Sequence, residues 1–223
     1  MTEDQDRADD PEQDHYFTAQ PASATERRTI RVRLAGRDVE VEVASGVFSP
    51  GRLDLGTQVL LRTVPPLDDV VADRAGAAHV LDLGCGWGPV ALTMASEAPD
   101  ATVWAVDVNE RALDLVRRNA ERLGLANVRA VTPGDLPDDV AFAAIWSNPP
   151  IRVGKDVLHA MLLHWLPRLE AGACAHLVVQ RNLGSDSLQR WLAEHLPPLL
   201  PGARVERAAS AKGFRVLEVR APA

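Results

Sequence analysis

The chain has 223 residues, 46% hydrophobic and 25% charged, with a formal net charge of −7 at pH 7. A chain of this length buries roughly 70% of the surface that its unfolded form exposes, so it needs no disulfide or metal to hold a core. Residues 1–14 carry seven acids and one base, and the other residues sum to only −1. The chain therefore lacks the overall basic excess of a committed nucleic-acid binder, although RNA binding remains open.

Cysteine usage and hydropathy indicate a reduced, soluble, cytoplasmic protein. Cys85 and Cys174 have neither metal-ligand spacing nor a disulfide pattern. The N-terminus shows no basic stretch followed by an apolar one, and no apolar run approaches the roughly 18 residues of a membrane span. His159 and His164 lie in a predicted helix without acidic or cysteine partners at metal spacing, so we expect no bound metal.

The first quarter of the chain predicts a tail, a hairpin and a helix. Residues 1–14 have almost nothing to bury, which predicts a disordered acidic tail. Apolar residues alternate between Thr29 and Val43 on both sides of Ala35-Gly36-Arg37-Asp38, which predicts a β hairpin. Residues 51–61 predict a loop that leads into a short helix before Pro65-Pro66.

From residue 79 onward, strands are expected to alternate with helices. Short apolar runs occur near residues 79–83, 102–106, 128–131, 141–146 and 173–180. Between and after these runs, apolar residues recur at helical spacing, which predicts helices at Ala112 to Leu123, around Leu158 to Leu166 and around Leu188 to Leu196. Gly124 is expected to cap the first of these helices. Residues 205–219, with Lys212-Gly213 in the middle, predict a closing hairpin. The pattern predicts an α/β fold with a mostly parallel, doubly wound sheet.

A glycine-rich loop follows the first of these strands, in the segment from Val80 to Pro89. Pro89 suits the first position of a helix, and the glycines allow a ligand to approach the backbone. The third glycine of a dinucleotide fingerprint would fall at 89, so the spacing disfavours NAD. Asp82 before the loop favours a ligand-binding role, whereas a purely structural turn is the alternative.

Two acidic residues follow the next strands. Asp107 ends a strand about 20 residues beyond the loop, where a ribose-binding acid is expected, although Asp107 or Asn109 would also suit a helix cap. Gly134-Asp135 follows the third strand, and its carboxylate is suited to accept from an adenine amine. An ordinary turn explains Pro133-Gly134-Asp135 equally well.

The tetrapeptide Ser147-Asn148-Pro149-Pro150 ends an apolar run. An amine that attacks a methyl sulfonium must aim its lone pair at the methyl group while acceptors hold its N–H groups. Asn148 offers one acceptor, and Pro149 offers a carbonyl whose direction is stiffened by the proline ring. By itself, the motif is also compatible with a simple end of a strand.

Together, VLDLGCGWGP, VDVN, GD and SNPP resemble class I S-adenosylmethionine-dependent methyltransferases. Further segments are similar to the family with the "methyltransferase small" domain, which includes ribosomal RNA guanine methyltransferases: HYFTAQPAS at 15–23, GVFSPGRLDLGT at 46–57, SNPPIRVGK at 147–155 and KGFRVLE at 212–218. The resemblance implies a seven-stranded sheet and a division into residues 15–66, with the hairpin and a cofactor-covering segment, and a catalytic core at 67–223.

The resemblance also implies roles for individual residues. Asp82, Gly84 and Gly86 would line the methionine and ribose part of S-adenosylmethionine. Asp107 would bind the ribose and Asp135 the adenine. Asn148 with Pro149, stiffened by Pro150, would hold the target amine. The segment 46–57 would bring Phe48, Ser49 and Thr57 near the cofactor.

The chain departs from the family's pattern at Ile151, where many amino methyltransferases have an aromatic residue that stacks on the flipped base. Tyr16, Phe17 and Phe214 are candidates for that stacking, with a core position as the alternative. Some larger members also carry a second, degenerate domain that a chain of this length would not contain, so target choice is not inherited from them.

Basic residues give two candidate RNA contacts. Arg152, Lys155 and Arg181 flank the predicted pocket and are expected to contact phosphates. The arginines of the predicted hairpin form a second basic strip or, as the favoured alternative, an ordinary solvated face: Arg27, Arg28, Arg31, Arg33 and Arg37.

The expected activity is methyl transfer from S-adenosylmethionine to a guanine amine of ribosomal RNA. A protein glutamine amide is the alternative acceptor, and a non-catalytic cofactor-binding or ribosome-assembly module is the alternative class. The particular nucleotide, the choice between naked RNA and an assembled particle, and the oligomeric state stay open.

Overall fold

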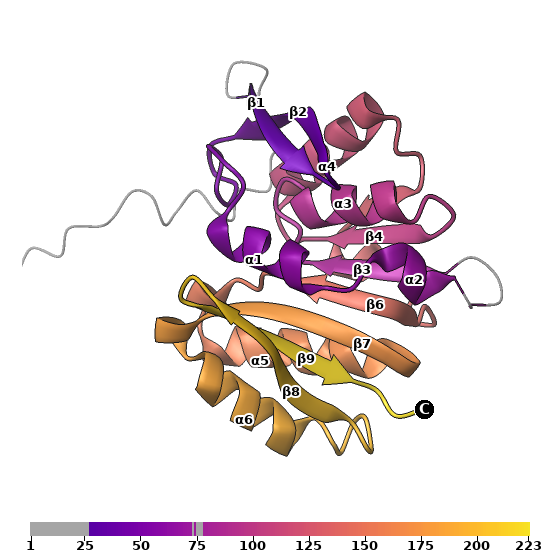
Figure 1. Ribbon diagram of the computed structural model, residues 1–223, viewed down its shortest axis with the longest axis vertical. Coiled ribbons are helices and arrows are strands. Elements are labelled where there is room, and N and C mark those ends of the chain that lie inside the picture. The colour runs from indigo at the N-terminus through magenta and orange to yellow at the C-terminus, as the bar shows by residue number, and fades with distance from the viewer. Residues whose placement is uncertain (1–26, 73, 75–77) are drawn as a thin grey trace, which may run out of the picture.

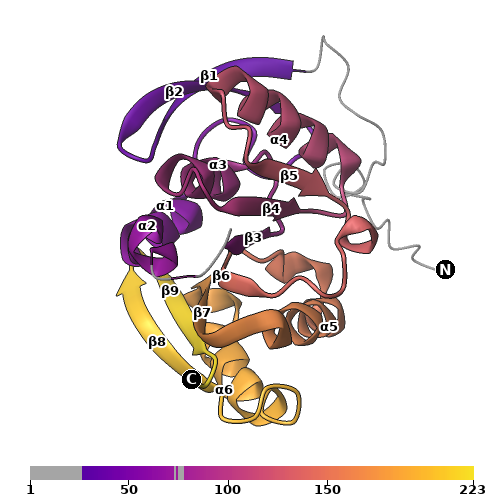
Figure 2. The same ribbon diagram turned by 90° about the vertical axis from the view of Figure 1, so that its right-hand side faces the viewer.

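The computed structural model describes residues 27–72, 74 and 78–223, apart from the Arg152 side chain. The predicted acidic tail and the stacking candidates Tyr16 and Phe17 lie outside the described residues. A two-stranded hairpin stands beside a seven-stranded sheet that has helices on both faces (Figures 1 and 2). This is the α/β fold that the sequence predicts.

The seven-stranded sheet has the order β5-β4-β3-β6-β7-β9-β8. Strands β3 to β7 pair in parallel, and β9 runs antiparallel to both of its neighbours, β7 and β8. Their bounds are β3 His79–Leu83, β4 Thr102–Val106, β5 Val128–Val131, β6 Phe142–Ser147, β7 Leu169–Gln180, β8 Arg204–Ala211 and β9 Phe214–Arg220. The β8–β9 hairpin turns at Lys212-Gly213, as predicted.

Six α-helices are described: α1 Leu55–Thr63, α2 Leu67–Val71, α3 Pro89–Glu97, α4 Glu110–Leu123, α5 Lys155–Trp165 and α6 Ser185–His195. Helices α1 to α4 share one buried cluster with side chains such as Val80, whereas α5 and α6 share another with Leu81 and Leu83 (Figure 2). Successive side chains of a strand point to opposite faces, so this alternation follows from the two-residue period of β3. The caps also agree with the sequence, since Pro89 opens α3 and Gly124 ends α4 with a φ of 69°.

The N-terminal hairpin consists of β1 Arg27–Leu34 and β2 Arg37–Ala44. Its two-residue turn places Ala35 and Gly36 at φ values of 45° and 74°, as a tight hairpin with right-handed strand twist requires. A two-stranded ribbon is marginal alone, so it needs a partner. Its apolar face packs on α3 and α4, in a cluster that contains Val41, Val43 and Trp87.

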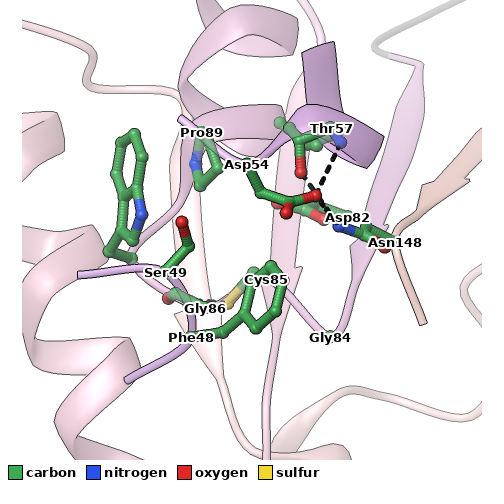
Figure 3. Close-up of a pocket in the computed structure, with 12 residues that line it drawn as sticks. Phe48, Ser49, Asp54, Thr57, Asp82, Gly84, Cys85, Gly86, Pro89 and Asn148 are labelled. Atoms are coloured by element: carbon green, nitrogen blue, oxygen red, sulfur yellow. Dashed lines mark hydrogen bonds between the residues drawn. The ribbon is translucent and has the colours of Figure 1, made fainter. Parts of the chain in front are cut away.

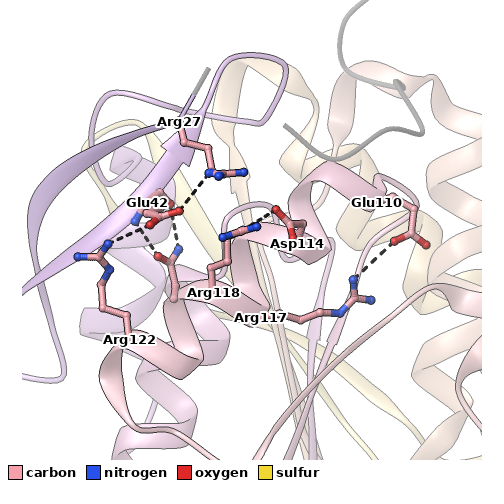
Figure 4. Close-up of polar contacts among 8 residues, drawn as sticks. Arg27, Glu42, Glu110, Asp114, Arg117, Arg118 and Arg122 are labelled. Carbon is pink, nitrogen blue, oxygen red and sulfur yellow. Dashed lines mark hydrogen bonds and ion pairs between the residues drawn. The ribbon is translucent and has the colours of Figure 1, made fainter. Parts of the chain in front are cut away.

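Polar contacts also tie the hairpin to α4 (Figure 4). The fully buried Asn119 accepts from the Glu42 N–H at 2.6 Å and donates to the carbonyls of Glu42 and Trp87 at 3.0 and 3.1 Å. The Glu42 carboxylate pairs with Arg27 at 3.4 Å and with Arg122 at 2.9 Å. The hairpin is thus joined to both a helix and the glycine-rich loop.

Two elements differ from the prediction. Helix α2 was not expected, because five residues after Pro65-Pro66 show no helical period. Strand β7 begins at Leu169 rather than near residue 173. Its first residues were missed because Glu170, Ala171 and Gly172 separate Leu169 from the apolar run. Within the described part of the chain, no helix is long and apolar enough to cross a membrane.

Candidate functional site

A pocket lies at the carboxyl ends of β3 and β6, where the strand order changes direction (Figure 3). Leu83 pairs with Ser147, whose hydroxyl donates to the Leu83 carbonyl at 2.6 Å. A Cβ built on Gly84 would contact Pro150 Cδ at 3.6 Å. The glycine-rich loop therefore faces the Asn-Pro-Pro turn, at the position where doubly wound sheets bind ligands.

The pocket draws its residues from three stretches of the chain. The segment before and within α1 supplies one wall, the glycine-rich loop with the start of α3 supplies the floor, and the end of β6 supplies one residue. The lining residues are Phe48, Ser49, Asp54, Thr57, Asp82, Gly84, Cys85, Gly86, Trp87, Pro89, Val90 and Asn148. Phe48, Ser49 and Thr57 thus lie beside the loop, as the sequence predicts.

Asp82 is almost completely buried, with 1% of its surface exposed. One carboxylate oxygen, Oδ2, accepts from the Ala91 N–H at 2.9 Å, and the other, Oδ1, is buried without a partner among the described residues. Burial raises the pKa of Asp82 to about 8, and the nearby charge of Asp107 adds to this rise, against the Ala91 hydrogen bond. An acceptor left without a partner in a pocket fits a cationic ligand group such as an ammonium.

Asp107 organises the glycine-rich loop from the end of β4. Its two carboxylate oxygens accept from the N–H groups of Gly86 at 2.9 Å and Asn109 at 3.0 Å. Burial raises its pKa, while these hydrogen bonds lower it. Asn109 caps α4 by accepting from the Arg111 N–H at 3.0 Å, so the alternative reading of Asn109 as a cap is correct. A carboxylate has about four acceptor positions, so Asp107 retains the capacity to accept from a ligand hydroxyl.

Gly84 and Gly86 bend the loop at φ values of 75° and 53°. The Gly84 and Cys85 N–H groups both donate to the Val106 carbonyl, at 2.8 and 3.0 Å. An open space surrounds the position of a Cβ on Gly86. A ligand can therefore approach the loop backbone closely, as the fit to a nucleoside cofactor requires.

Asn148 lines the same pocket as Asp82, with its amide turned toward the start of α1 (Figure 3). Its Nδ2 donates to Asp54 Oδ2 at 3.0 Å and to Thr57 Oγ1 at 3.1 Å. A carboxylate only accepts hydrogen bonds, so the NH₂ side of the Asn148 amide must face Asp54. The acceptor Oδ1 consequently points away from α1. Sequence reasoning missed Asp54, whose only local signal is its position as an N-cap.

Several predicted residues lie outside the lining of this pocket. Asp135 is exposed in the 3₁₀ turn Pro133–Asp135, where it accepts from the Thr132 hydroxyl at 2.7 Å. Lys155 is exposed at the start of α5, and Arg181 is exposed in the 3₁₀ turn Arg181–Leu183. Arg152 lies in the 3₁₀ turn Ile151–Val153.

Neither Ile151 nor the stacking candidate Phe214 lines the pocket. Ile151 is half-buried and packs against the cluster beneath α5 and α6. Phe214 packs against the cluster beneath α1, where its ring approaches Gly56. Phe48, which was predicted only as a neighbour of the cofactor, is the exposed aromatic residue of the pocket lining, with 47% of its surface accessible.

Comparison with known proteins identifies the family. The family description "Methyltransferase small domain" matches residues 38–218 of this chain. The chain belongs to the methyltransferase small domain family. This membership confirms the predicted reaction class and S-adenosylmethionine as the cofactor of its methyl transfer. The match crosses the predicted boundary between residues 66 and 67, and the division into two parts stays a prediction.

Three relatives illustrate the similarity. The uncharacterized protein YbxB of Bacillus subtilis is 35% identical over 81% of this chain and 88% of its own length. Ribosomal RNA small subunit methyltransferase C of Hahella chejuensis is 32% identical, over 69% of this chain and 43% of its own. The T. Thermophilus 16S rRNA N2 G1207 methyltransferase, solved with AdoMet and guanosine, has a TM-score of 0.69 at 22% identity, covering 90% of this chain and 52% of that chain.

The identities and coverages determine which properties can be assigned to this chain. The solved structure confirms the class I methyltransferase fold. The match covers less than half the length of the ribosomal RNA small subunit methyltransferase C of H. chejuensis, so that protein's substrate does not transfer with the family name. Among the described residues, no group of three or more His, Cys, Asp and Glu could hold a metal ion.

Proposed function

We propose that this protein transfers a methyl group from S-adenosylmethionine to the exocyclic amine of a guanine in ribosomal RNA. The observation that carries the proposal is the Asn148 amide, whose hydrogens are both held by α1 and whose oxygen is left to accept from an amine beside the glycine-rich loop. Relatives whose names specify ribosomal RNA methyltransferases support the choice of acceptor.

The cofactor is proposed to bind over the glycine-rich loop, and when bound it supplies an activated methyl group on a sulfonium. Asp82 Oδ1, which is buried without a partner, would accept from its ammonium group. Gly84 and Gly86 leave room along the loop backbone, and Asp107 would accept from the ribose hydroxyls. Asp135 would bind the adenine amine after a change in its present bond to Thr132.

Asn148 and Pro149 are proposed to hold the guanine amine. The Asn148 Oδ1 atom and the Pro149 carbonyl accept from the two N–H groups, so that the nitrogen lone pair is directed at the methyl carbon. With the cofactor bound, the new nitrogen–carbon bond would form as its sulfur–carbon bond breaks, and one amine proton would then be lost to solvent. No strong base is needed, because the amine becomes positively charged as it is methylated and its proton is then acidic enough to pass to solvent.

Lys155 and Arg181 are proposed to contact RNA phosphates, together with Arg152. Both described side chains are exposed, and neither forms an ion pair with another described residue. The arginines of the hairpin differ, since Arg31 pairs with Glu40 at 3.5 Å and Arg33 with Asp38 at 3.6 Å. These ion pairs favour the reading of the hairpin strip as an ordinary solvated face, and phosphate binding is assigned to Arg152, Lys155 and Arg181.

The proposal predicts that Asn148→Ala abolishes methylation while cofactor binding persists. Removing a pre-organised polar group of this kind typically costs about 10²-fold or more in turnover. We would incubate wild type and variant with radiolabelled S-adenosylmethionine and separated RNA, ribosomal-particle and protein fractions, then digest labelled RNA to nucleosides. The expected product is N2-methylguanosine from ribosomal RNA.

A matched control is Gln189→Ala on α6, on the other face of the sheet; it should keep full activity. Label only in protein would replace the proposal by glutamine methylation. Cofactor binding without transfer to any fraction would indicate the non-catalytic module. Methylation of RNA by Asn148→Ala at the wild-type rate would refute the role given to this residue.

A further inference from the structure

The start of α1 is bonded to Asn148 by more contacts than a helix cap needs. Asp54 Oδ2 accepts from the Thr57 N–H at 3.1 Å, which is the ordinary N-cap bond, and also from Asn148 Nδ2. Thr57 is buried, and its hydroxyl accepts the second Nδ2 hydrogen. Serine or asparagine would cap the helix as well as aspartate does, so capping alone does not require a charge here.

The neighbouring residues make room for this carboxylate. Gly56 is buried, and a Cβ at this position would lie 2.9 Å from Asp54 Oδ2 and 2.9 Å from Phe214 Cε1. Its backbone needs no special φ, so the absence of a side chain serves space alone. Gly56 therefore lets the carboxylate approach Asn148 while the β8–β9 hairpin packs against the same turn of α1.

We propose that Asp54 is a positioning residue for methyl transfer, with Thr57 as its partner, an inference that rests on the function proposed above. Two acceptors on one side of the Asn148 amide prevent its rotation, so that Oδ1 always faces the target amine.

The negative charge of Asp54 has a second effect, through the amide itself. Hydrogen bonds in a chain polarise one another, so a carboxylate that accepts from Nδ2 makes Oδ1 a stronger acceptor. The attacking amine becomes positively charged only as the new bond forms. Asp54 therefore stabilises the transition state more than the bound substrate, which is the condition for an effect on turnover.

Asp54→Asn tests the charge while keeping a side-chain oxygen for the helix cap. We expect kcat to fall by about ten- to a hundredfold, as is found for hydrogen-bond partners that orient metal ligands, while the Kd for S-adenosylmethionine stays within about twofold of wild type. Thr57→Val should lower kcat in the same way, and Thr57→Ser, which keeps the hydroxyl, should restore it. Wild-type kcat in Asp54→Asn, or equal losses in Thr57→Ser and Thr57→Val, would overturn the proposal.

A readout without catalysis separates this inference from the proposed function. The Asn148 side-chain NH₂ signals, identified in ¹⁵N spectra by their loss in Asn148→Ala, should exchange slowly with water in the wild type and faster in Thr57→Val, but not in Thr57→Ser. Equal, fast exchange in all three proteins would refute the positioning role. If no fraction is methylated by the wild type but this exchange pattern is found, the proposed function fails while the hold on Asn148 stands.

Discussion

Among single residues, Asp82 carries the clearest electrostatic signature of the pocket. Its carboxylate is buried, has one unpartnered oxygen and has a pKa raised to about 8. In the ligand-free protein it is therefore mainly protonated at pH 7. A bound ammonium favours the ionised form, so cofactor binding and loss of this proton are thermodynamically linked.

Cofactor affinity should consequently rise as the pH increases toward about 8, by at most about tenfold per pH unit, and level off above that pH. The sign follows from the raised pKa: below 8, the free protein must first lose a proton to pair with the cofactor. Calorimetry in buffers of different ionisation enthalpy would show proton release on binding. Asp82→Asn should bind more weakly, without this pH dependence; a pH-independent wild-type affinity would contradict the role of Asp82.

At the scale of elements, the hairpin and α4 behave as one unit with the glycine-rich loop. Asn119 satisfies backbone groups on both β2 and the loop residue Trp87, and it does so with no exposure to water. Buried polar groups that lose their partners cost about 1–3 kcal/mol each. Asn119 therefore helps to set the position of the pocket wall at Phe48 and Ser49, which follow β2, together with Asn109, which donates to the Gly46 carbonyl at 3.1 Å.

Asn119→Ala should lower the free energy of unfolding by about 2–4 kcal/mol, because it leaves several buried backbone groups without partners. Denaturant titration followed by circular dichroism would measure the loss. Arg118→Ala on the same helix removes only the exposed ion pair with Asp114, and it should change stability by less than about 0.5 kcal/mol. Equal effects of the two variants would show that the Asn119 contacts contribute little.

Elements with a clear apolar period can be predicted from the sequence, and those without one cannot. Strands and helices with a clear apolar period, such as β4 and α4, were predicted close to their bounds, because periodicity reports which face is buried. Helix α2 and the first residues of β7 carry no such period. Their structure depends on packing against distant segments.

The pocket divides in the same way. Asp82, the glycines and Asn148 lie in local motifs, so sequence alone indicated them. The contact between Asp54 and Asn148 joins positions 94 residues apart, and the buried link from Asn119 to Glu42 joins positions 77 apart. Single-chain patterns carry no record of such pairs. The sequence likewise shows no aromatic residue at Ile151, and it does not indicate that the distant Phe48 is the exposed aromatic residue of the pocket lining.

For the whole molecule, the distribution of charge matters more than the sum of −7. Much of the excess acid is in residues 1–14, and arginines on the hairpin and α4 are paired with acids, as Figure 4 shows for Arg117 with Glu110 and Arg118 with Asp114. Such surface pairs are nearly neutral toward a polyanion. RNA affinity should therefore depend on the few cations outside these pairs.

Replacing Lys155 and Arg181 together by alanine should weaken RNA binding and reduce its salt dependence. Each lost phosphate contact to a single strand lowers the slope of log affinity against log salt by about 0.7. Fluorescence anisotropy over a range of KCl concentrations would measure the slope. The double variant of Arg31 and Arg33, both ion-paired, is the matched control; a larger effect of that control would move the RNA surface to the hairpin.

The order of the strands in space also has a consequence for the order of events during synthesis. Every residue that lines the pocket has been made once Asn148 is in the chain. Yet α1, which carries Asp54 and Thr57, packs on β7 and β9, and Phe214 of β9 lies against Gly56. A nascent chain that ends after β6 thus contains the whole set of pocket residues but not the surface that places them. The ability to bind and react should emerge only when the last strand has left the ribosome.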